Sequence, residues 1–163
     1  MPRQRNVQVR TTPLGRGVFA VKAIGPEEVV GAVSGRLIND PDHDSRYCVD
    51  VGNGWTLEPR SPFRFLNHCC VPNCQFVYTE VRPANARTKV RANEPNRSLF
   101  VETLRVIEPG EELLIDYAWT PDAAIRCLCG SDKCRGWIVD KSQLKTLLKT
   151  VAKETPEELA MRY

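Results

Sequence analysis

Short apolar runs separated by turn residues occupy the first 117 residues, a pattern that is typical of a mostly β protein. Residues 7–12 and 18–21 predict two strands on either side of Gly15-Arg16-Gly17. We interpret these glycines as a tight turn where the backbone approaches another group closely, with a plain hairpin turn as the alternative. Further strands are predicted at residues 29–33, 37–38, 47–51, 55–57, 75–81, 88–91, 98–104 and 113–117.

The last 24 residues follow a helical pattern instead. Leu144, Leu147, Leu148 and Val151 are spaced as i, i+3, i+4 and i+7, which predicts one apolar stripe on a helix that Ser142 caps. The segment 155–158, Thr-Pro-Glu-Glu, has the cap, proline and acids of a second helix start. We expect this helical pair to pack on the domain, and a helix that binds a partner is the alternative.

Composition indicates one globular domain. The chain has 163 residues, of which 42% are hydrophobic and 26% are charged. No run reaches the ~18 apolar residues of a membrane span, and the first residues lack the apolar core of a signal peptide. We therefore expect no membrane partner and an intracellular location, cytoplasmic or nuclear/nucleoid-associated.

The net charge of +3 decides little, but its distribution is uneven. Basic residues are concentrated in residues 1–22 and 82–97. Two solvated polar surfaces explain this pattern, and a rim that attracts an acidic partner or nucleic acid is the second interpretation.

Cysteine spacing predicts a metal site. In a reducing compartment, the clustering of seven cysteines favours metal binding or catalysis over disulfides. Cys127, Cys129 and Cys134 share one short loop and supply three ligands of a tetrahedral zinc site. The fourth ligand must come from elsewhere, and we choose Cys70, with Cys69 and Cys74 as alternatives.

Four thiolates leave zinc no open position, so the metal is expected to be structural. It would hold residues 120–139 against Asn67 and His68. Cys48 stands alone in a predicted strand, and we expect it to be a core residue.

Four groups of residues, in order, resemble the motifs of SET-domain protein-lysine methyltransferases with a post-SET zinc segment. They are Gly15-Arg-Gly-Val-Phe19, Arg64-Phe-Leu-Asn-His68 with Pro72-Asn73, Gly110-Glu-Glu-Leu113 through Asp116-Tyr117, and Cys127-x-Cys-Gly-x3-Cys-Arg-Gly136. The resemblance runs from about residue 5 to residue 139.

The resemblance implies small curved β-sheets around a pseudoknot, followed by a zinc-stapled post-SET loop and a C-terminal helical tail. The corresponding segments are 5–119, 120–139 and 140–163. It also implies transfer of methyl from S-adenosylmethionine to a lysine amine of a protein substrate, for which a histone or another basic protein is a candidate. Direct nucleic-acid binding is not expected, because no recognition helix directly follows the zinc loop.

The resemblance assigns roles by position. Gly15, Arg16, Gly17, Tyr47, Asn67, His68 and Trp137 would bind the cofactor, Tyr117 would be catalytic, Val33, Ile115 and Trp119 would lie along the lysine channel, and Cys70 would complete one structural zinc site with Cys127, Cys129 and Cys134.

Three positions depart from the family pattern. Val33 and Ile115 stand where tyrosine or another aromatic residue is common, and Cys69 replaces a usual serine. The first two favour an alternative function, a catalytically degenerate SET-fold module that binds a protein. Retention of Asn67 and Tyr117 favours the enzyme.

Overall fold

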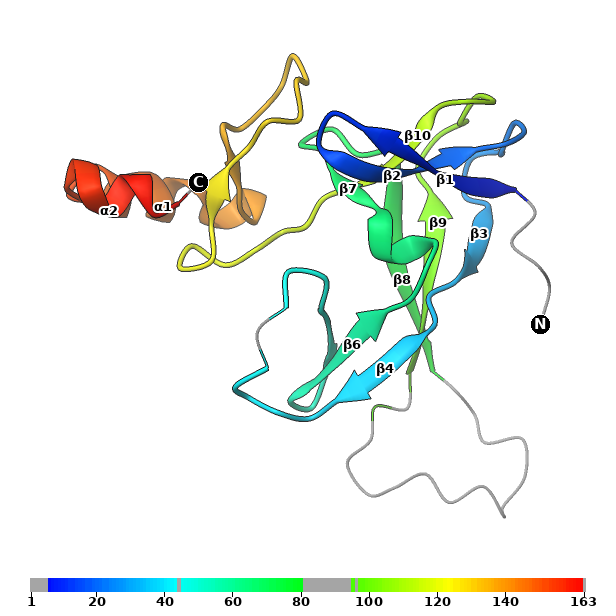
Figure 1. The fold of residues 1–163 in the computed structure, drawn as a ribbon, viewed down its shortest axis with the longest axis horizontal. Coiled ribbons are helices and arrows are strands. Elements are labelled where there is room, and N and C mark those ends of the chain that lie inside the picture. The colour runs from blue at the N-terminus through cyan, green and yellow to red at the C-terminus, as the bar shows by residue number, and fades with distance from the viewer. Residues whose placement is uncertain (1–5, 44, 81–94, 96, 163) are drawn as a thin grey trace.

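The computed structural model describes residues 6–43, 45–80, 95 and 97–162, and its described part is mostly β (Figure 1). The strands form three small sheets of order β1-β2-β10-β7, β3-β9-β8 and β4-β6-β5, and a separate pair β11-β12. The strand bounds are β1 Val7–Thr12, β2 Gly15–Ala20, β3 Val29–Ala32, β4 Gly35–Ile38, β5 Val49–Gly52, β6 Trp55–Pro59, β7 Asn67–His68, β8 Cys74–Glu80, β9 Arg97–Thr103, β10 Glu112–Ile115, β11 Ile125–Arg126 and β12 Trp137–Ile138.

The prediction of a turn at residues 15–17 is wrong, because these residues begin β2. Thr12 pairs with Gly15, so the reversal of the chain falls at residues 13 and 14. The predicted close approach is confirmed at Gly17, where a Cβ atom would collide with the side chain of Glu112. A larger residue at Gly17 would therefore displace the Glu112 carboxylate that accepts from Asn67.

The segment after β7 wraps around β10, and this is the crossing that the family resemblance predicts. β7 runs parallel to β10, with Asn67 opposite Leu114. Asn73 is buried, and its Oδ1 accepts from the amide of Leu114 at 2.7 Å while its Nδ2 donates to the carbonyl of Glu112 at 2.8 Å. One buried amide side chain thus satisfies two backbone groups of β10.

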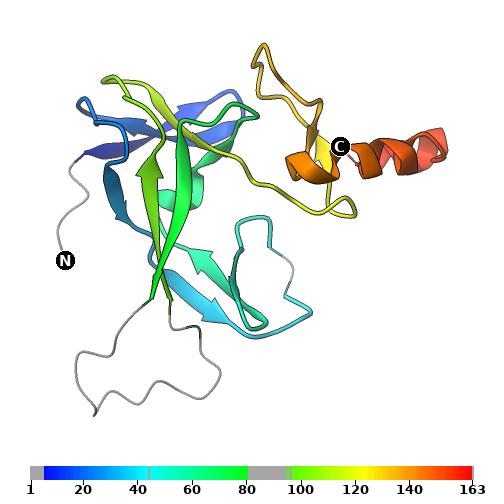
Figure 2. The same cartoon turned by 180° about the vertical axis from the view of Figure 1, so that it is seen from behind.

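Two separate hydrophobic clusters stabilise the described chain. The larger lies between the three sheets and includes Val18, Val101 and Leu113. The smaller contains Ala124, Trp137, Val139 and Leu147, with Leu144, Val151 and Leu159 packed against it. Both ribbon views show residues 120–162 as a lobe beside the sheets (Figures 1 and 2).

The helical tail packs on the zinc segment rather than on the sheets. It comprises the 3-10 helix η2 (Lys141–Gln143), α1 (Leu144–Val151) and α2 (Pro156–Ala160); the other 3-10 helix, η1, is Phe63–Phe65. Asp140, not the predicted Ser142, caps the first turn by accepting from the Ser142 amide. The predicted cap at Thr155 is confirmed, since Thr155 and Glu158 form a reciprocal capping box.

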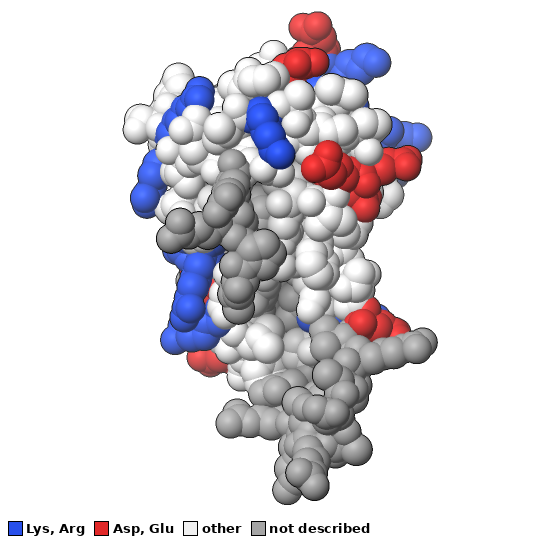
Figure 3. Space-filling model, turned by 90° about the vertical axis from the view of Figure 1, so that its right-hand side faces the viewer, with Lys and Arg blue, Asp and Glu red and all other residues white. Residues whose placement is uncertain are grey.

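Several sequence expectations concern regions with limited description. The strand predicted at 88–91 lies outside the described residues. So do the basic residues of the 82–97 segment, except for Arg97. The face in Figure 3 carries groups of both signs among uncharged residues. No described helix is long and apolar enough to cross a bilayer.

Candidate active site

Two adjoining cavities open beside β7 and β10. The larger has a volume of about 640 Å³ and the smaller about 210 Å³. Their walls share Tyr47, Arg64, Leu66 and Tyr117. This shared wall is where a group bound in one cavity comes closest to a group bound in the other.

The smaller cavity is lined by the start of β2 and by β7. Gly15 has a φ of 117°, which favours glycine and exposes backbone on this wall. Asn67 Nδ2 donates to the Arg16 carbonyl at 3.0 Å and to Glu112 Oε1 at 2.7 Å. These two bonds fix the Asn67 side chain through its Nδ2, and neither of them uses its Oδ1.

Two guanidinium groups border the smaller cavity. Arg16 lies 3.8 Å from the ring centroid of Phe65, and Arg64 lies 3.8 Å from that of Tyr47. Stacking on aromatic faces orients both cations, and Arg64 is also paired with the Glu58 carboxylate. Arg16 is therefore the cation that favours a ligand with a carboxylate end here.

Tyr117 stands at the junction as a neutral hydroxyl. Its O–H donates to the Leu66 carbonyl at 2.8 Å. Burial, with Tyr47 and Glu112 nearby, raises the pKa of Tyr117 to about 12. Its ring stacks on Trp119 with centroids 5.3 Å apart. Tyr117 can therefore orient a bound group, and it is not an available base at neutral pH.

His68 is buried behind Tyr117 and connects it to the cysteines. Its Nδ1 accepts from the Tyr117 amide at 3.2 Å, so the ring proton belongs on Nε2, which lies 3.4 Å from Cys70 Sγ. Burial lowers the pKa of His68 to about 4 despite the nearby Asp116 carboxylate, and the charge of Arg135 lowers it further. His68 lies outside the described walls of both cavities, so its predicted role in cofactor binding stays a prediction.

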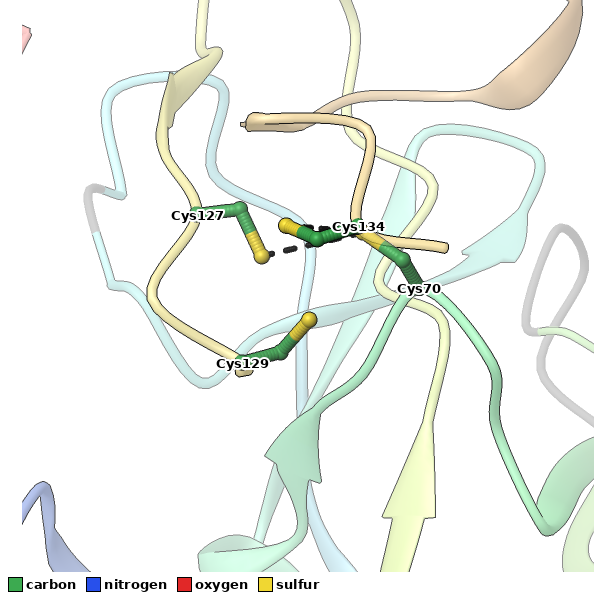
Figure 4. Close-up of side chains that lie close together, drawn as sticks. All are labelled: Cys70, Cys127, Cys129 and Cys134. Atoms are coloured by element: carbon green, nitrogen blue, oxygen red, sulfur yellow. Dashed lines mark hydrogen bonds between the residues drawn. The ribbon is translucent and has the colours of Figure 1, made fainter. Parts of the chain in front are cut away.

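Four cysteines converge from two loops, the one after β7 and the one between β11 and β12 (Figure 4). The Sγ atoms of Cys70, Cys127, Cys129 and Cys134 all lie within 4.8 Å of one another. Cys70 Sγ is 3.7 Å from Cys127 Sγ and 4.0 Å from Cys134 Sγ. Tetrahedral zinc with bonds of about 2.3 Å places sulfurs about 3.8 Å apart.

Backbone amides complete the surroundings of these thiols. Arg135 N donates to Cys70 Sγ and Gly136 N to Cys134 Sγ, each at 3.3 Å. Burial opposes ionisation of Cys129, but amide hydrogen bonds from Cys70 and Ser131 help to lower its pKa to about 6. The donor set therefore fits Zn²⁺ and includes Cys70, whereas Cys74 lies in the larger hydrophobic cluster.

An ion pair joins the cysteine loop to the active site. Arg135 Nη1 and Nη2 each lie 2.7 Å from an oxygen of Asp116. Asp116 directly precedes Tyr117, and Arg135 directly follows Cys134. The ion pair therefore couples the position of the cysteine loop to that of Tyr117, which lies at the cavity junction.

The structure brings most of the sequence-predicted residues to the two cavities. Gly15, Arg16, Asn67, Tyr47 and Tyr117 line the smaller one, and Ile115, Trp119, Tyr47 and Tyr117 line the larger one.

Besides His68, three predicted residues lie elsewhere. Val33 is buried in the larger hydrophobic cluster and Trp137 in the smaller one, where the Arg126 guanidinium covers its ring at 4.0 Å. Gly17 faces Glu112. None of the three belongs to the described cavity walls, so their proposed contacts with cofactor or lysine remain predictions.

Sequence reasoning missed the roles of Arg64, Glu112 and Arg135. All three were part of the quoted motifs but were given no function there. The role of Glu112 could have been predicted from its place in the sequence. A carboxylate next to the buried Leu113 needs a hydrogen-bond donor, and Asn67 supplies it. The prediction that Cys48 is a core residue is wrong, because its half-buried thiol bonds to Glu58.

The profile of the SET domain matches residues 15–118. The chain belongs to the SET-domain family. It is 31% identical over 166 residues to the histone-lysine N-methyltransferase ash1 of Drosophila melanogaster, covering 94% of this chain and 7% of the relative. It is 38% identical over 141 residues to the H3 lysine-4 specific histone-lysine N-methyltransferase of Debaryomyces hansenii, covering 75% of this chain and 12% of the relative.

A solved Plasmodium falciparum structure has the same fold. Its TM-score is 0.54 at 19% identity, and the match covers 70% of this chain and 98% of that one. The chain thus spans a small fraction of these curated relatives and nearly all of the structural neighbour.

Proposed function

We propose that this chain transfers methyl from S-adenosylmethionine to a lysine side-chain amine of a protein. The observation that carries the proposal is the meeting of two cavities at Tyr117. Methyl transfer to an amine is an in-line displacement, so donor and acceptor must enter from opposite sides and meet at one point.

The smaller cavity suits the amino-acid end of the methyl donor. The guanidinium group of Arg16 favours its carboxylate, and the exposed backbone at Gly15 and the fixed amide of Asn67 supply hydrogen-bonding groups. When bound, S-adenosylmethionine supplies an activated methyl on a positively charged sulfur.

The larger cavity suits a lysine side chain. Ile115, Phe76 and Trp119 offer apolar walls for its methylene stem, and Asp50 offers negative charge near a cationic segment. We infer a protein substrate with an accessible lysine, and a histone is the first candidate because the matched relatives are named for histone lysines. A nuclear or nucleoid location follows from that candidate.

The amine must lose its proton before it reacts. Free lysine has a pKa of about 10.4, so neutralising it at pH 7.4 costs about 4 kcal/mol. A dry channel and a nearby positive sulfur both reduce this cost. The neutral hydroxyl of Tyr117 and the carbonyl of Leu66 can then orient the amine, while the proton leaves to water.

The four cysteines would hold one structural zinc. With four thiolates the metal has no open position, so it supplies folding energy and fixes the loop rather than reacting. Arg135 carries that order to Asp116 beside Tyr117.

The alternative, a degenerate SET-fold module that binds a protein, has weaker support. Val33 was its first argument, and Val33 is buried away from the described cavity walls. Ile115 does line the larger cavity, and it changes the shape of the wall relative to the aromatic residue that is common there. The residues at the junction of the two cavities are still present.

Calorimetric titration of the zinc-loaded protein with S-adenosylmethionine tests the proposal. We expect micromolar binding that weakens at least about tenfold in Asn67→Ala, because a positioned polar partner is lost. Asn39→Ala is the matched control, since Asn39 bonds to the Gly54 carbonyl outside both cavity walls. A folded, zinc-loaded protein that does not bind the donor would overturn the enzyme and leave the binding module.

A further inference from the structure

A second group of metal-binding side chains lies apart from the four cysteines. His43 and Cys48 come from the segment between β4 and β5, and Glu58 comes from β6. One ligand atom of each lies within 4.8 Å of the other two. All three are partly buried, so an ion can reach them and still lose most of its water.

One of the two distances that the structure gives suits tetrahedral coordination, and the other is short. Cys48 Sγ lies 3.1 Å and His43 Nε2 lies 3.5 Å from the same oxygen, Glu58 Oε2. In a tetrahedral zinc site the nitrogen and oxygen ligands are about 3.4 Å apart and the sulfur and oxygen ligands about 3.6 Å apart. A shift of about half an ångström at Cys48 would admit the ion.

The two oxygens of Glu58 face different groups. Oε1 accepts from the guanidinium of Arg64, and Oε2 lies close to Cys48 Sγ and His43 Nε2. The carboxylate is ionised at neutral pH, because hydrogen bonds from Ser45, Cys48, Arg64 and His43 outweigh burial and lower its pKa to about 2. A ligand oxygen with full negative charge is therefore already in place.

Hydrogen bonding alone is the simpler account of this group. The Cys48 thiol and a protonated His43 nitrogen can both donate to Oε2 without any metal. The geometry distinguishes the two accounts less than metal binding does, because only a metal site would take up a divalent cation through these three converging ligand atoms.

We propose that His43, Cys48 and Glu58 form a second divalent metal site, which takes Zn²⁺ through three protein ligands and leaves one position open. The mixture of thiolate, imidazole and carboxylate selects zinc over Mg²⁺ or Ca²⁺, which prefer oxygen ligands. With one ligand fewer and only one thiolate, this site binds more weakly than the four cysteines.

The proposed metal site lies beside the larger cavity. Cys48 and its neighbour Tyr47 line the larger cavity, and Arg64, held by Glu58, stacks on Tyr47 at the junction. A metal ion here would tie the segment that carries Tyr47 to β6. The site thus fixes one wall of the proposed active site from outside.

Cobalt titration tests the site directly. The full chain, loaded with one zinc at the four cysteines, is titrated with Co²⁺, whose visible and near-ultraviolet bands report tetrahedral geometry and thiolate ligation. We expect one further equivalent of Co²⁺ with the charge-transfer band of a single thiolate. Zinc should then displace it.

Variants of single ligands assign the signal. Cys48→Ser should remove the thiolate band, and His43→Ala should weaken binding by more than the 10–100-fold that loss of an outer partner costs. Asp42→Asn and Cys74→Ala are controls for a nearby exposed carboxylate and for a cysteine elsewhere, and both should bind as the parent does.

Two results would overturn the proposal. One is no cobalt bound beyond the first metal in the folded parent, and the other is an unchanged second equivalent in Cys48→Ser. Circular dichroism and retention of the first zinc establish that each variant is folded. Neither methyl donor nor substrate is present, so the outcome is independent of the proposed methyl transfer.

Discussion

Arg135 and Asp116 form a two-bond ion pair, at 2.7 Å for each bond, between the cysteine loop and the residue that precedes Tyr117. The Arg135 side chain is 10% exposed and that of Asp116 is 26% exposed. Such a pair is well shielded from solvent, and its planar geometry is one that lysine cannot reproduce. It is the direct side-chain link between the proposed zinc loop and the proposed catalytic residue.

Arg135→Lys is therefore expected to lower kcat with little change in bound zinc. Loss of the two-bond geometry should cost about 2 kcal/mol, which is roughly thirtyfold in rate if it falls on the transition state. Steady-state kinetics and metal analysis measure both quantities. The control is Arg105→Lys at the more exposed pair with Glu111, where we expect less than about 1 kcal/mol. Equal losses in the two variants would show that Arg135 has no special role.

Removal of zinc should loosen residues 120–139 before the sheets unfold. The cysteine loop holds β11 and β12 in place, because Cys127 N donates to the Gly136 carbonyl beside the cluster. We expect a strong chelator to lower the melting temperature and to abolish amide protection in β11 and β12 while protection in β8 and β9 persists. Hydrogen exchange with and without chelator measures this, and Cys127→Ser should reproduce it. Cys74→Ala should retain the tightly bound zinc.

Tyr117→Phe should separate catalysis from folding. The phenyl ring keeps the stacking on Trp119, and only the hydroxyl bonded to the Leu66 carbonyl is lost. We expect kcat to fall about 100-fold, as for loss of a positioned donor, with binding of the methyl donor changed less than threefold. A variant that is folded and fully active would mean that Tyr117 is a structural residue.

The ionisation of Tyr117 should be delayed to strongly alkaline pH. Burial raises its pKa to about 12, above the value of about 10 for an exposed tyrosine. The unfolded state therefore loses this proton first, and the contribution of Tyr117 to stability is lost as pH rises from about 10 to about 12. The tyrosinate absorbance of the parent minus that of Tyr117→Phe isolates this group. A difference spectrum with a midpoint near pH 10 would contradict the buried environment.

Two adjacent leucines of α1 test which face of the helix packs. Leu147 is fully buried in the smaller hydrophobic cluster, whereas Leu148 is 48% exposed. Leu147→Ala should cost about 2–5 kcal/mol of unfolding free energy, and Leu148→Ala about 0.5 kcal/mol or less. Urea denaturation measures both, and similar losses would contradict this packing.

The sequence was informative wherever chemistry depends on residue type and spacing. Cys127, Cys129 and Cys134 predicted three ligands of a metal site, and the structure groups them with Cys70, the fourth ligand chosen from the sequence. Strand positions followed from apolar runs and turn residues. The capping box at Thr155 was readable because its partners are three residues apart.

The errors fall where one residue type suits more than one environment. Gly15 to Gly17 looked like a turn, because glycine marks both turns and close contacts between strands. Cys48 was assigned to the core because it stands alone in a predicted strand, but it precedes β5 and its thiol bonds to Glu58 of β6. The packing of Trp137 depends on the pairing of β11 with β12 and on the cover supplied by Arg126, which no local pattern encodes, and its contact with a cofactor stays a prediction.

The packing of the tail determines how short a fragment of this chain can be and still fold. Arg162 donates to the carbonyls of Pro121 and Ala124, and its own carbonyl accepts from Arg126 at 3.2 Å, so the last described residue closes onto β11. A fragment cut at residue 118, where the family match stops, would lose three of the four clustered cysteines, and one cut at 139 would lose Leu147. The region that family comparison defines is therefore shorter than the region that must be expressed together.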